Sequence, residues 1–358
     1  MDRSYMKIKD NQMLESVTIK EAISIMDNIG HGFCICVDAD HKVTGIMTDG
    51  DFRRGVLNDV DLNQPVKLIF NKDFISVNKG FKNKEIENIF TTTSVKIIPI
   101  IDFDGLLNDV VLKDRWDDKA KVAKVKRSIP YPVVIMAGGK GTRLAPFTKI
   151  LPKPLLPLGD EPVIKVIMDK FNNSGVNKFY ITVNSKKQMI KGYFHDHESP
   201  YEIQFVDEDE PLGTAGSLGL IKKDINTDFF VINCDVILDI DYGEMVKFHN
   251  KGEYDLTLAA SLRKYTIPYG VCKINDKGLL LSMEEKPEQY FLVNTGLYFL
   301  NNSVLDLING DEFMHMTDIV NTLKNSGFKV GVYPVTEKSW LDVGQWEEYS
   351  ATLKQLGL

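Results

Sequence analysis

A glycine-rich segment directly after an apolar run constrains the fold of this chain more than any other feature. The run Val133–Met136 has the composition of a buried strand, and residues 137–144, which follow it, read Ala-Gly-Gly-Lys-Gly-Thr-Arg-Leu. Glycines in this position let the backbone approach a phosphate closely and present its N–H groups. Arg143 and Lys153 add positive charge nearby. The segment predicts a triphosphate site at the end of a strand, expected at 133–137.

The chain as a whole is acidic, so an anionic ligand must bind where basic residues are concentrated locally. The chain has 358 residues with 43 Lys and Arg against 50 Asp and Glu, a net charge of −7. An acidic chain lacks the excess cations on which sequence-independent nucleic-acid binding depends, so we expect no nucleic-acid partner. With 43% hydrophobic and 26% charged residues, it is typical of a globular protein, and its length favours two or three domains.

Apolar runs alternate with amphipathic segments after residue 131, which predicts an α/β domain with a largely parallel sheet. Helices are expected at 162–173 and 317–325. Strands are expected at 133–137, 178–183, 201–206, 229–233, 256–261 and 295–300.

A domain boundary is expected before this region. Seven of the fourteen prolines lie between Pro130 and Pro162, directly after a charged stretch, 113–127. We therefore expect an N-terminal module at 1–118, a linker at 119–130 and a larger domain at 131–358. The basic residues of the linker are interrupted by acids, which favours a solvated segment over a nucleic-acid patch.

The N-terminal module repeats itself weakly. Ser16-Val17 and Ser76-Val77 each precede an amphipathic segment, a β-rich run, a turn and a second apolar run. This is a β-α-β-β unit twice, over about 12–62 and 66–118. Such short units bury little surface alone, so we expect the copies to pack together around a cleft.

The end of the first copy, Gly-Ile-Met-Thr-Asp-Gly-Asp at 45–51, resembles the closing signature of cystathionine-β-synthase (CBS) domains. The resemblance implies an α+β tandem CBS module in which Thr48 and Asp51 bind an adenine nucleotide. A carboxylate can accept from both ribose hydroxyls. The second copy keeps Asp114 but has Val111 in place of the hydroxyl residue. A packing module without ligand is the alternative.

The glycine-rich segment is followed by Leu-Pro-Lys-Pro-Leu at 151–155 and Glu-Asp-Glu-Pro-Leu-Gly-Thr-Ala-Gly at 208–216. Further along come Asn-Cys-Asp at 233–235, Tyr-Gly-Val at 269–271, Glu-Glu-Lys-Pro at 284–287, Asn-Thr-Gly at 294–296 and Trp-Leu-Asp-Val-Gly at 340–344. In this order the segments resemble the sugar-phosphate nucleotidyltransferases, over essentially all of 131–358. The resemblance implies a Rossmann-like, mixed-sheet nucleotidyltransferase domain.

The reaction implied by the resemblance is attack of a sugar 1-phosphate on the α-phosphorus of a nucleoside triphosphate, which releases pyrophosphate. Both reactants are polyanions, so cations must suppress their repulsion. The resemblance assigns Arg143 to the pyrophosphate, Lys153 to the sugar phosphate, and Asp235 and Asp342 to Mg²⁺, which prefers oxygen ligands. Nucleotide contacts are expected at Ala137, Gly138, Gly139, Gly141, Thr142, Glu208, Pro211, Gly213 and Thr214. Sugar-phosphate contacts are expected at Tyr269, Gly270, Glu285, Lys286, Asn294 and Thr295.

The choice of base can be argued from Glu208. Guanine offers two adjacent donors, N1–H and the 2-amino group, to one carboxylate, whereas uracil and thymine offer a single donor between two acceptors. This favours GTP, and the loop resembles that of mannose-1-phosphate guanylyltransferases. Mannose 1-phosphate and glucosamine 1-phosphate both stay open as the acceptor. UTP, dTTP or CTP as the donor is one alternative, and a catalytically silent nucleotide-sensing regulator is another.

The remaining features predict little chemistry. Cys34, Cys36, Cys234 and Cys272 lack zinc-like spacing, so reduced core thiols are expected. His195-Asp196-His197 precedes Ser199-Pro200, which favours an exposed loop over a zinc site. We expect neither a membrane span nor a secretory leader, which favours a cytoplasmic location. We also expect no appended acetyltransferase domain. We expect a homo-oligomer.

Overall fold

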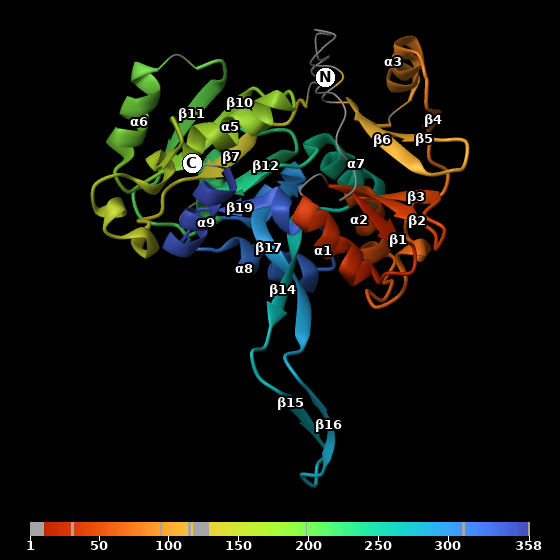
Figure 1. Ribbon diagram of the computed structural model, residues 1–358. Coiled ribbons are helices and arrows are strands. Elements are labelled where there is room, and N and C mark those ends of the chain that lie inside the picture. The colour runs from red at the N-terminus through yellow and green to blue at the C-terminus, as the bar shows by residue number, and fades with distance from the viewer. Residues whose placement is uncertain are drawn as a thin grey trace. The chain divides into compact units, whose positions relative to one another are not determined.

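The computed structural model (Figure 1) describes residues 11–29, 32–93, 95–113, 116, 129–197, 199–309 and 312–356. The chain divides into two compact units, Met1–Val125 and Lys126–Leu358, and each is described here by itself. Their boundary falls within the segment expected to be a linker, most of which lies outside the described residues, as does Asp114. None of the described helices is both long and apolar enough to cross a membrane.

The first unit contains the predicted repeat. Its first copy comprises β1 Gln12–Leu14, α1 Ile19–Ile29, β2 Phe33–Val37, β3 Val43–Thr48 and α2 Asp49–Leu57. The second comprises β4 Val77–Asn78, α3 Asn83–Thr92, β5 Ile97–Ile101 and β6 Leu107–Leu112. In each copy the first two strands pair in parallel and the last two pair antiparallel. The two copies are therefore the same β-α-β-β unit.

The copies pack against each other through a shared apolar cluster. Phe33, Ile35 and Ile46 of the first copy lie in one cluster with Val110 of the second. The Val43 amide donates to the carbonyl of Gly105 at 2.9 Å, which ties the two sheets together. The second copy also has an apolar cluster of its own, which includes Val77, Ile86 and Phe90. Packing of two such short copies against each other is as expected from their size.

A mixed seven-stranded sheet, in the order β11-β10-β7-β12-β17-β14-β18, forms the centre of the second unit. The strands are β7 Val133–Met136, β10 Lys178–Val183, β11 Glu202–Asp207, β12 Phe229–Asn233, β14 Leu256–Thr266, β17 Glu288–Leu300 and β18 Val330–Val335. The first four pair in parallel, whereas β17 runs antiparallel to both β12 and β14. All six expected strands are present, and β17 makes the sheet mixed.

Helices cover both faces of this sheet because successive strand residues point to opposite sides. Val133 and Ile135 lie in one core cluster, and Val134 and Met136 lie in the other. The helices are α5 Val163–Asn173, α6 Lys187–Asp196, α7 Tyr242–Gly252, α8 Met316–Asn325 and α9 Trp346–Leu356. Side chains of α8 pack into the second cluster, and those of the other four helices pack into the first. The unit is a three-layer α/β structure.

Short strand pairs complete the second unit. Strand β13 Val236–Leu238 pairs with β19 Trp340–Asp342, and β8 Pro157–Leu158 pairs with β9 Glu161–Pro162. Strands β14 and β17 continue beyond the sheet into the pair β15 Val271–Ile274 and β16 Leu280–Glu284, which projects away from the sheet in Figure 1. The sequence analysis did not anticipate this projection.

Candidate functional site

The glycine-rich segment and Asp235 lie together at one edge of the central sheet. Strands β7 and β12 are adjacent and parallel, with Met136 opposite Asn233. The glycine-rich segment leaves the carboxyl end of β7, and Asp235 follows the carboxyl end of β12. Carboxyl edges of parallel strands are where open α/β sheets bind ligands. The topology therefore brings together two segments that are almost a hundred residues apart in sequence.

Lys153, Asp235 and Asp342 converge on Gly344. The Lys153 ammonium donates to Asp235 Oδ2, and these side chains are only 10% and 13% exposed. Pairing of β13 with β19 brings the second acid alongside, with the Val343 amide donating to the Asp235 carbonyl at 2.9 Å. A Cβ on Gly344 would lie 2.6 Å from Asp235 Oδ2 and 2.8 Å from Asp342 Oδ1. Both acids therefore face the same small space.

Burial and the neighbouring carboxylate raise the pKa of Asp342 above its ordinary value, and burial has the larger effect. The Gly344 amide, which donates to Asp342 Oδ1 at 2.6 Å, and the Lys153 ammonium act in the opposite direction. Two acids held close at low exposure repel each other unless a cation lies between them. The Lys153 ammonium, which is paired with Asp235, offsets part of this repulsion, and a bound metal ion would offset more of it.

Glu348 is a third acid near this cluster, and the sequence analysis did not single it out. Its charge also raises the pKa of Asp342. Its Oε2 is buried and has no hydrogen-bond partner among the described residues, while Oε1 has only the Gln345 amide at 3.4 Å. Its place on α9, six residues after Asp342, is the signal that could have identified it.

The donors fit Mg²⁺. Asp235 and Asp342 supply hard carboxylate oxygens, and Mg²⁺ is usually bound by one or two carboxylates together with substrate phosphates. No group of three or more His, Cys, Asp or Glu among the described residues is arranged to hold a metal by itself. The two acids would hold the ion together with water and with oxygens from a bound phosphate.

The glycine-rich segment packs tightly at both ends and is open in its middle. Ala137 is buried, and its amide donates to the Thr182 carbonyl at 3.0 Å. Gly141 adopts a φ of +66°, and a Cβ there would lie 2.9 Å from Thr148 Cγ2 and 3.2 Å from Lys153 Cβ. Gly139 is exposed, and nothing lies within 4 Å of the Cβ it lacks. The open middle leaves backbone accessible to a ligand.

The exposed side chains of Thr142 and Arg143 lie in the 3₁₀ helix Thr142–Leu144 that ends this segment. Among the described residues Arg143 has no ion-pair partner, so its charge is available to an anion.

Glu208 lies directly beneath Gly138. A Cβ on that glycine would come within 2.6 Å of Glu208 Oε1, and Glu208 is only 3% exposed. The Leu212 amide donates to Oε2 at 3.4 Å. Burial raises the pKa of Glu208, and this hydrogen bond acts in the opposite direction. The carboxylate therefore contacts both its own loop and the glycine-rich segment.

The rest of that loop packs on residues 312–316 and not on the glycine-rich segment. Gly213 has a φ of +80°, and a Cβ there would lie 2.4 Å from the Met314 carbonyl oxygen. The Thr214 hydroxyl accepts from the Met316 amide at 3.0 Å at the start of α8. Pro211 is exposed between these contacts and Glu208. The segment around Met314, which the sequence analysis missed, packs against this loop and stabilises it.

The expected sugar-phosphate residues do not lie together. Asn294 and Thr295 lie in β17, whereas Tyr269, Gly270, Glu285 and Lys286 lie in the projecting segment between β14 and β17 (Figure 1). The hydroxyl of Thr295, which is 2% exposed, donates to the Ala259 carbonyl at 2.9 Å, and Asn294 donates to the Tyr298 hydroxyl at 2.6 Å. Both side chains already have partners within the sheet.

In the first unit, Thr48 and Asp51 form a reciprocal capping box at the start of α2. The Thr48 hydroxyl donates to Asp51 Oδ2 at 2.6 Å, and the Thr48 amide donates to the same oxygen at 2.9 Å. Arg54 donates to Oδ1 of Asp51, which is 3% exposed. Both carboxylate oxygens have partners in the protein, so the nucleotide role of this pair stays a prediction.

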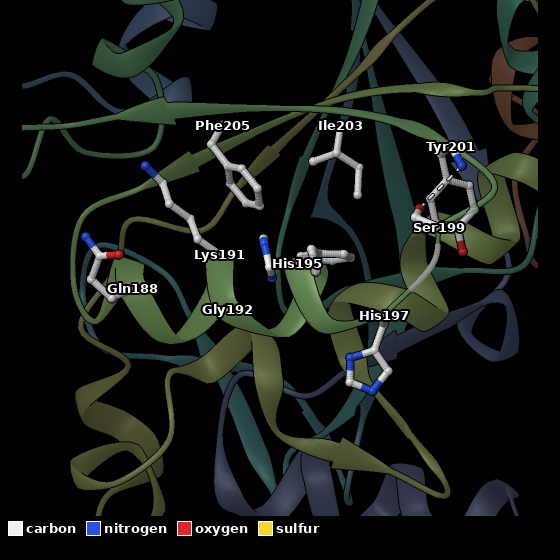
Figure 2. A pocket seen from close by; sticks show the side chains of 10 residues that line it. Gln188, Lys191, Gly192, His195, His197, Ser199, Tyr201, Ile203 and Phe205 are labelled. Atoms are coloured by element: carbon white, nitrogen blue, oxygen red, sulfur yellow. Dashed lines mark hydrogen bonds between the residues drawn. The ribbon is translucent and has the colours of Figure 1, made fainter.

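A shallow groove of about 630 Å³ lies between α6 and β11 (Figure 2). Its lining includes His195, in the last turn of α6, and His197, which follows the helix. Both are exposed, as expected, although His195 is helical and does not lie in a loop. Strand β11 is the edge strand of the sheet, two strands away from β7. The groove contains none of the residues expected to act on a nucleotide or a sugar.

The cysteines follow the expectation in three positions and depart from it in one. Cys34, Cys36 and Cys234 are buried, and burial raises the pKa of Cys34 and of Cys234 to about 12. Such thiols are inert. Cys272 is exposed, because β15 belongs to the projecting segment and not to a core.

Two family models match this chain. The model of the nucleotidyl transferase family matches residues 132–357, and the model of the CBS domain matches residues 13–58. The fold of the second unit is also found in HddC from Yersinia pseudotuberculosis, whose crystal structure superposes with a TM-score of 0.51 at 24% identity, covering 63% of this chain and 99% of that one.

Similar proteins of known name are mannose-1-phosphate guanyltransferases. That of Yarrowia lipolytica is 34% identical over 227 residues, and that of Pichia angusta is 35% identical over 231 residues. Each alignment covers 60% of this chain and 61% of the relative, so this chain spans about three fifths of the length of these relatives. Since the first family model accounts for more than half of the residues, the chain belongs to the nucleotidyl transferase family.

Proposed function

We propose that the protein transfers a guanylyl group from GTP to a hexose 1-phosphate, mannose 1-phosphate or glucosamine 1-phosphate, releasing pyrophosphate. The observation that carries the proposal is the convergence of Lys153, Asp235 and Asp342 beside an open glycine-rich segment. A nucleotidyl transfer between two polyanions needs this combination of a phosphate-binding backbone, a cation and metal-binding acids. The names of the similar proteins support the same reaction.

The chain's own residues would act by binding and orienting. Backbone N–H groups of the glycine-rich segment hold the triphosphate, and Arg143 neutralises charge on the departing pyrophosphate. Lys153 holds the phosphate of the sugar so that its oxygen attacks in line. Mg²⁺ held by Asp235 and Asp342 would supply electrostatic stabilisation of the charge on the phosphates. The attacking oxygen is already ionised, so no general base is required.

The buried pair of Lys153 and Asp235 fits a resting state of this site. Separating such a pair without compensation would leave buried charge, which is costly. Mg²⁺ held by Asp235 would take the place of the lysine as the counter-charge of that acid, and a phosphate bound to Lys153 would take the place of the aspartate, so each buried charge would keep a partner. This favours a site that engages its cationic and anionic ligands jointly.

Glu208 supports guanine as the base. It lies beneath Gly138 of the glycine-rich segment, and one carboxylate can accept both donors of guanine. Besides the Leu212 amide at 3.4 Å, the hydroxyls of Thr182 and Ser217 act on this carboxylate and lower its pKa, so a bound guanine would have to compete with these donors. Glutamine in its place would offer one acceptor and one donor group, which suits uracil or thymine.

The experiment that tests the proposal measures pyrophosphate release with Mg²⁺ for GTP, UTP, dTTP and CTP, each with mannose, glucose and glucosamine 1-phosphate. We expect turnover with GTP and one of the two named sugars, and a loss of roughly 10–10²-fold in kcat/KM for GTP in Glu208→Gln, about one charge-assisted hydrogen bond. Turnover with another nucleotide would contradict the choice of base. No turnover with any pair, in a protein that still binds GTP, would favour a silent regulatory role.

A further inference from the structure

Lys186 lies between β10 and α6, and the proposed function assigns no role to its charge. Its ammonium donates to the Thr148 carbonyl at 2.7 Å. Thr148 is only 7% exposed, and its hydroxyl donates to the Gly141 carbonyl at 2.8 Å. Two hydrogen bonds in series therefore connect Lys186 to the glycine-rich segment.

This connection ends at a left-handed turn of the glycine-rich segment. Gly141 has a φ of +66°, and a Cβ there would lie 2.9 Å from Thr148 Cγ2. The Gly141 carbonyl accepts a second hydrogen bond, from the Leu144 amide, at 3.0 Å. Thr148 therefore fixes the turn both by contact and by hydrogen bonding. Because the torsion angles at Gly141 orient the peptide groups on either side of it, the turn sets where the N–H groups of the segment point.

The backbone of Lys186 indicates that its side chain has a function. Lys186 adopts a left-handed conformation, with φ +54° and ψ +31°, and its side chain does not cap α6, which it precedes. This conformation is costly for an L-residue, whereas glycine adopts it freely. A lysine here therefore costs the folded state free energy that glycine would not. Strained residues of this kind gather at functional sites.

The two residues before Lys186 hold the same loop against the candidate site. The Asn184 side-chain amide donates to the Glu208 carbonyl at 2.9 Å, and the Ser185 amide donates to the Gly138 carbonyl at 3.5 Å. The backbone of Lys186 is therefore fixed beside both the glycine-rich segment and the loop that carries Glu208. From this fixed point its side chain reaches the far end of the segment.

The next residue in the chain has the same charge and a different partner. Lys187 forms an ion pair with Asp207 at 3.4 Å, and both side chains are partly exposed. Lys186, in contrast, has no ion-pair partner among the described residues, and its hydrogen bond goes to a backbone carbonyl. Lys187 is therefore a matched control for Lys186.

We propose that Lys186 is a positioning residue for the triphosphate and acts through Thr148 on the turn at Gly141. This inference rests on the proposed function, because it concerns the segment that would hold GTP. Glycines lose more conformational freedom on ordering than other residues. The connection orders the turn before the ligand arrives, so that binding does not bear this cost.

Calorimetry of GTP binding in the presence of Mg²⁺ tests the side chain. Lys186→Met keeps the length of the side chain but removes the donor, so we expect the Kd for GTP to rise about tenfold, the worth of one hydrogen bond to a charged group. Lys186→Arg keeps a charged donor and should recover most of the affinity. Lys187→Met should stay within about twofold of the wild type. Equal affinity in the two methionine variants would overturn the proposal.

Lys186→Gly separates the side chain from the backbone. Glycine relieves the left-handed conformation, so we expect a Tm at least as high as that of Lys186→Met, together with the same loss of GTP affinity. Wild-type affinity in Lys186→Gly would contradict a role for the side chain. An affinity that followed the Tm across all variants would assign Lys186 a merely structural role and would equally reject the proposal.

A double-mutant cycle tests the route through Thr148. Thr148→Val removes the hydroxyl that bonds Gly141 and nearly preserves the shape of the side chain. Two links in series fail together, so Lys186→Met combined with Thr148→Val should bind GTP about as weakly as the weaker single variant. Effects that add would mean that Lys186 contacts the phosphates by itself, and the route through Thr148 would be wrong.

Hydrogen exchange of the protein without ligand tests the connection independently of the proposed function. Amides of residues 139–149 should exchange several-fold faster in Lys186→Met than in the wild type, whereas those of β7 should not change. A wild type that does not bind GTP would contradict the proposed function, and the difference in exchange would still decide whether Lys186 orders the segment. Unchanged exchange at 139–149 would show that it does not.

Discussion

Each unit of the protein holds an aspartate paired with a cation, and the two pairs differ in how they are assembled. Asp51 is paired with Arg54, three residues away on the same helix, and the arginine is 67% exposed. Asp235 is paired with Lys153, 82 residues away, and both side chains are nearly buried. The first pair is local, because both residues lie on α2 and Asp51 also caps the start of that helix. The second requires the whole sheet to form and leaves two acids facing one space, which is typical of a functional site.

Asp235→Asn should break this comparison most strongly. The amide keeps the size of the side chain but removes the charge that would hold a metal, so we expect turnover to fall about 10²–10³-fold, a typical effect of losing one electrostatic stabiliser. Steady-state pyrophosphate release measures this. Asp51→Asn is the matched control, and it should leave turnover within about twofold. Equal losses in the two variants would mean that the distant pair has no special role.

Asp49 is a half-buried acid in the first unit, and its substitution should change stability and not turnover. Burial raises its pKa from the ordinary 3.8 to about 6, opposed by Arg53 and Lys96 and aided by Asp27, and Oδ1 has no hydrogen-bond partner within the described structure. The folded state then binds the proton more tightly than the unfolded state. The resulting stability is present below about pH 4 and is lost as the pH rises through about 6.

Asp49→Asn should therefore stabilise the first unit at pH 7 by up to about 3 kcal/mol, the equivalent of the pKa shift. The gain should shrink as the pH falls toward 4. Denaturant unfolding at several pH values, followed by hydrogen exchange of peptides within 33–57, measures the change. Asp40→Asn, at an exposed turn, is the control. A gain that does not depend on pH would contradict the assigned pKa.

Gly344→Ala sharpens the comparison by changing geometry without changing charge. The added Cβ would lie within 3 Å of oxygens on both acids, so the carboxylates must move apart. We expect turnover to fall about 10–10²-fold, since small misplacements of reacting groups are costly. The control is Gly192→Ala in α6, where a Cβ meets nothing within 4 Å. Unchanged turnover in Gly344→Ala would show that the acids need not meet at this point.

The parts of the fold that depend on local pattern could be predicted from the sequence. Alternating apolar runs identified six strands of the central sheet, and a repeated pattern identified the two copies in the first unit. The projecting ends of β14 and β17 could not be identified this way, because their apolar residues have the same composition as a buried strand. Only the pairing partners decide whether such a strand lies in the sheet or beyond it.

In the candidate site, too, the residues could be predicted from local patterns, whereas their contacts depend on strand pairing. Asp235, Asp342 and Lys153 could be named from their segments, whereas their meeting point at Gly344 depends on the pairing of β13 with β19. Thr295 was expected to contact sugar, but its hydroxyl bridges β17 and β14, which only the register reveals. For Thr48 and Asp51 the signal was available, since a threonine followed three residues later by an acid is also the signature of a capping box.

Thr48→Ala gives the smallest expected effect and tests what the local pair is for. Removing the hydroxyl abolishes its bonds with Asp51, and loss of an N-cap side chain costs about 1 kcal/mol. Thr48→Ser keeps the hydroxyl and should restore most of the stability, measured as hydrogen exchange in α2, while turnover stays unchanged in both variants. Equal destabilisation by serine and alanine would assign the effect to the lost methyl group.

Calorimetry with AMP and ATP on the same proteins asks whether Thr48 and Asp51 also bind a nucleotide. Heat in the wild type and in Thr48→Ser but not in Thr48→Ala would give the pair this second role. A nucleotide that needs the Thr48 hydroxyl must compete with Asp51 for it.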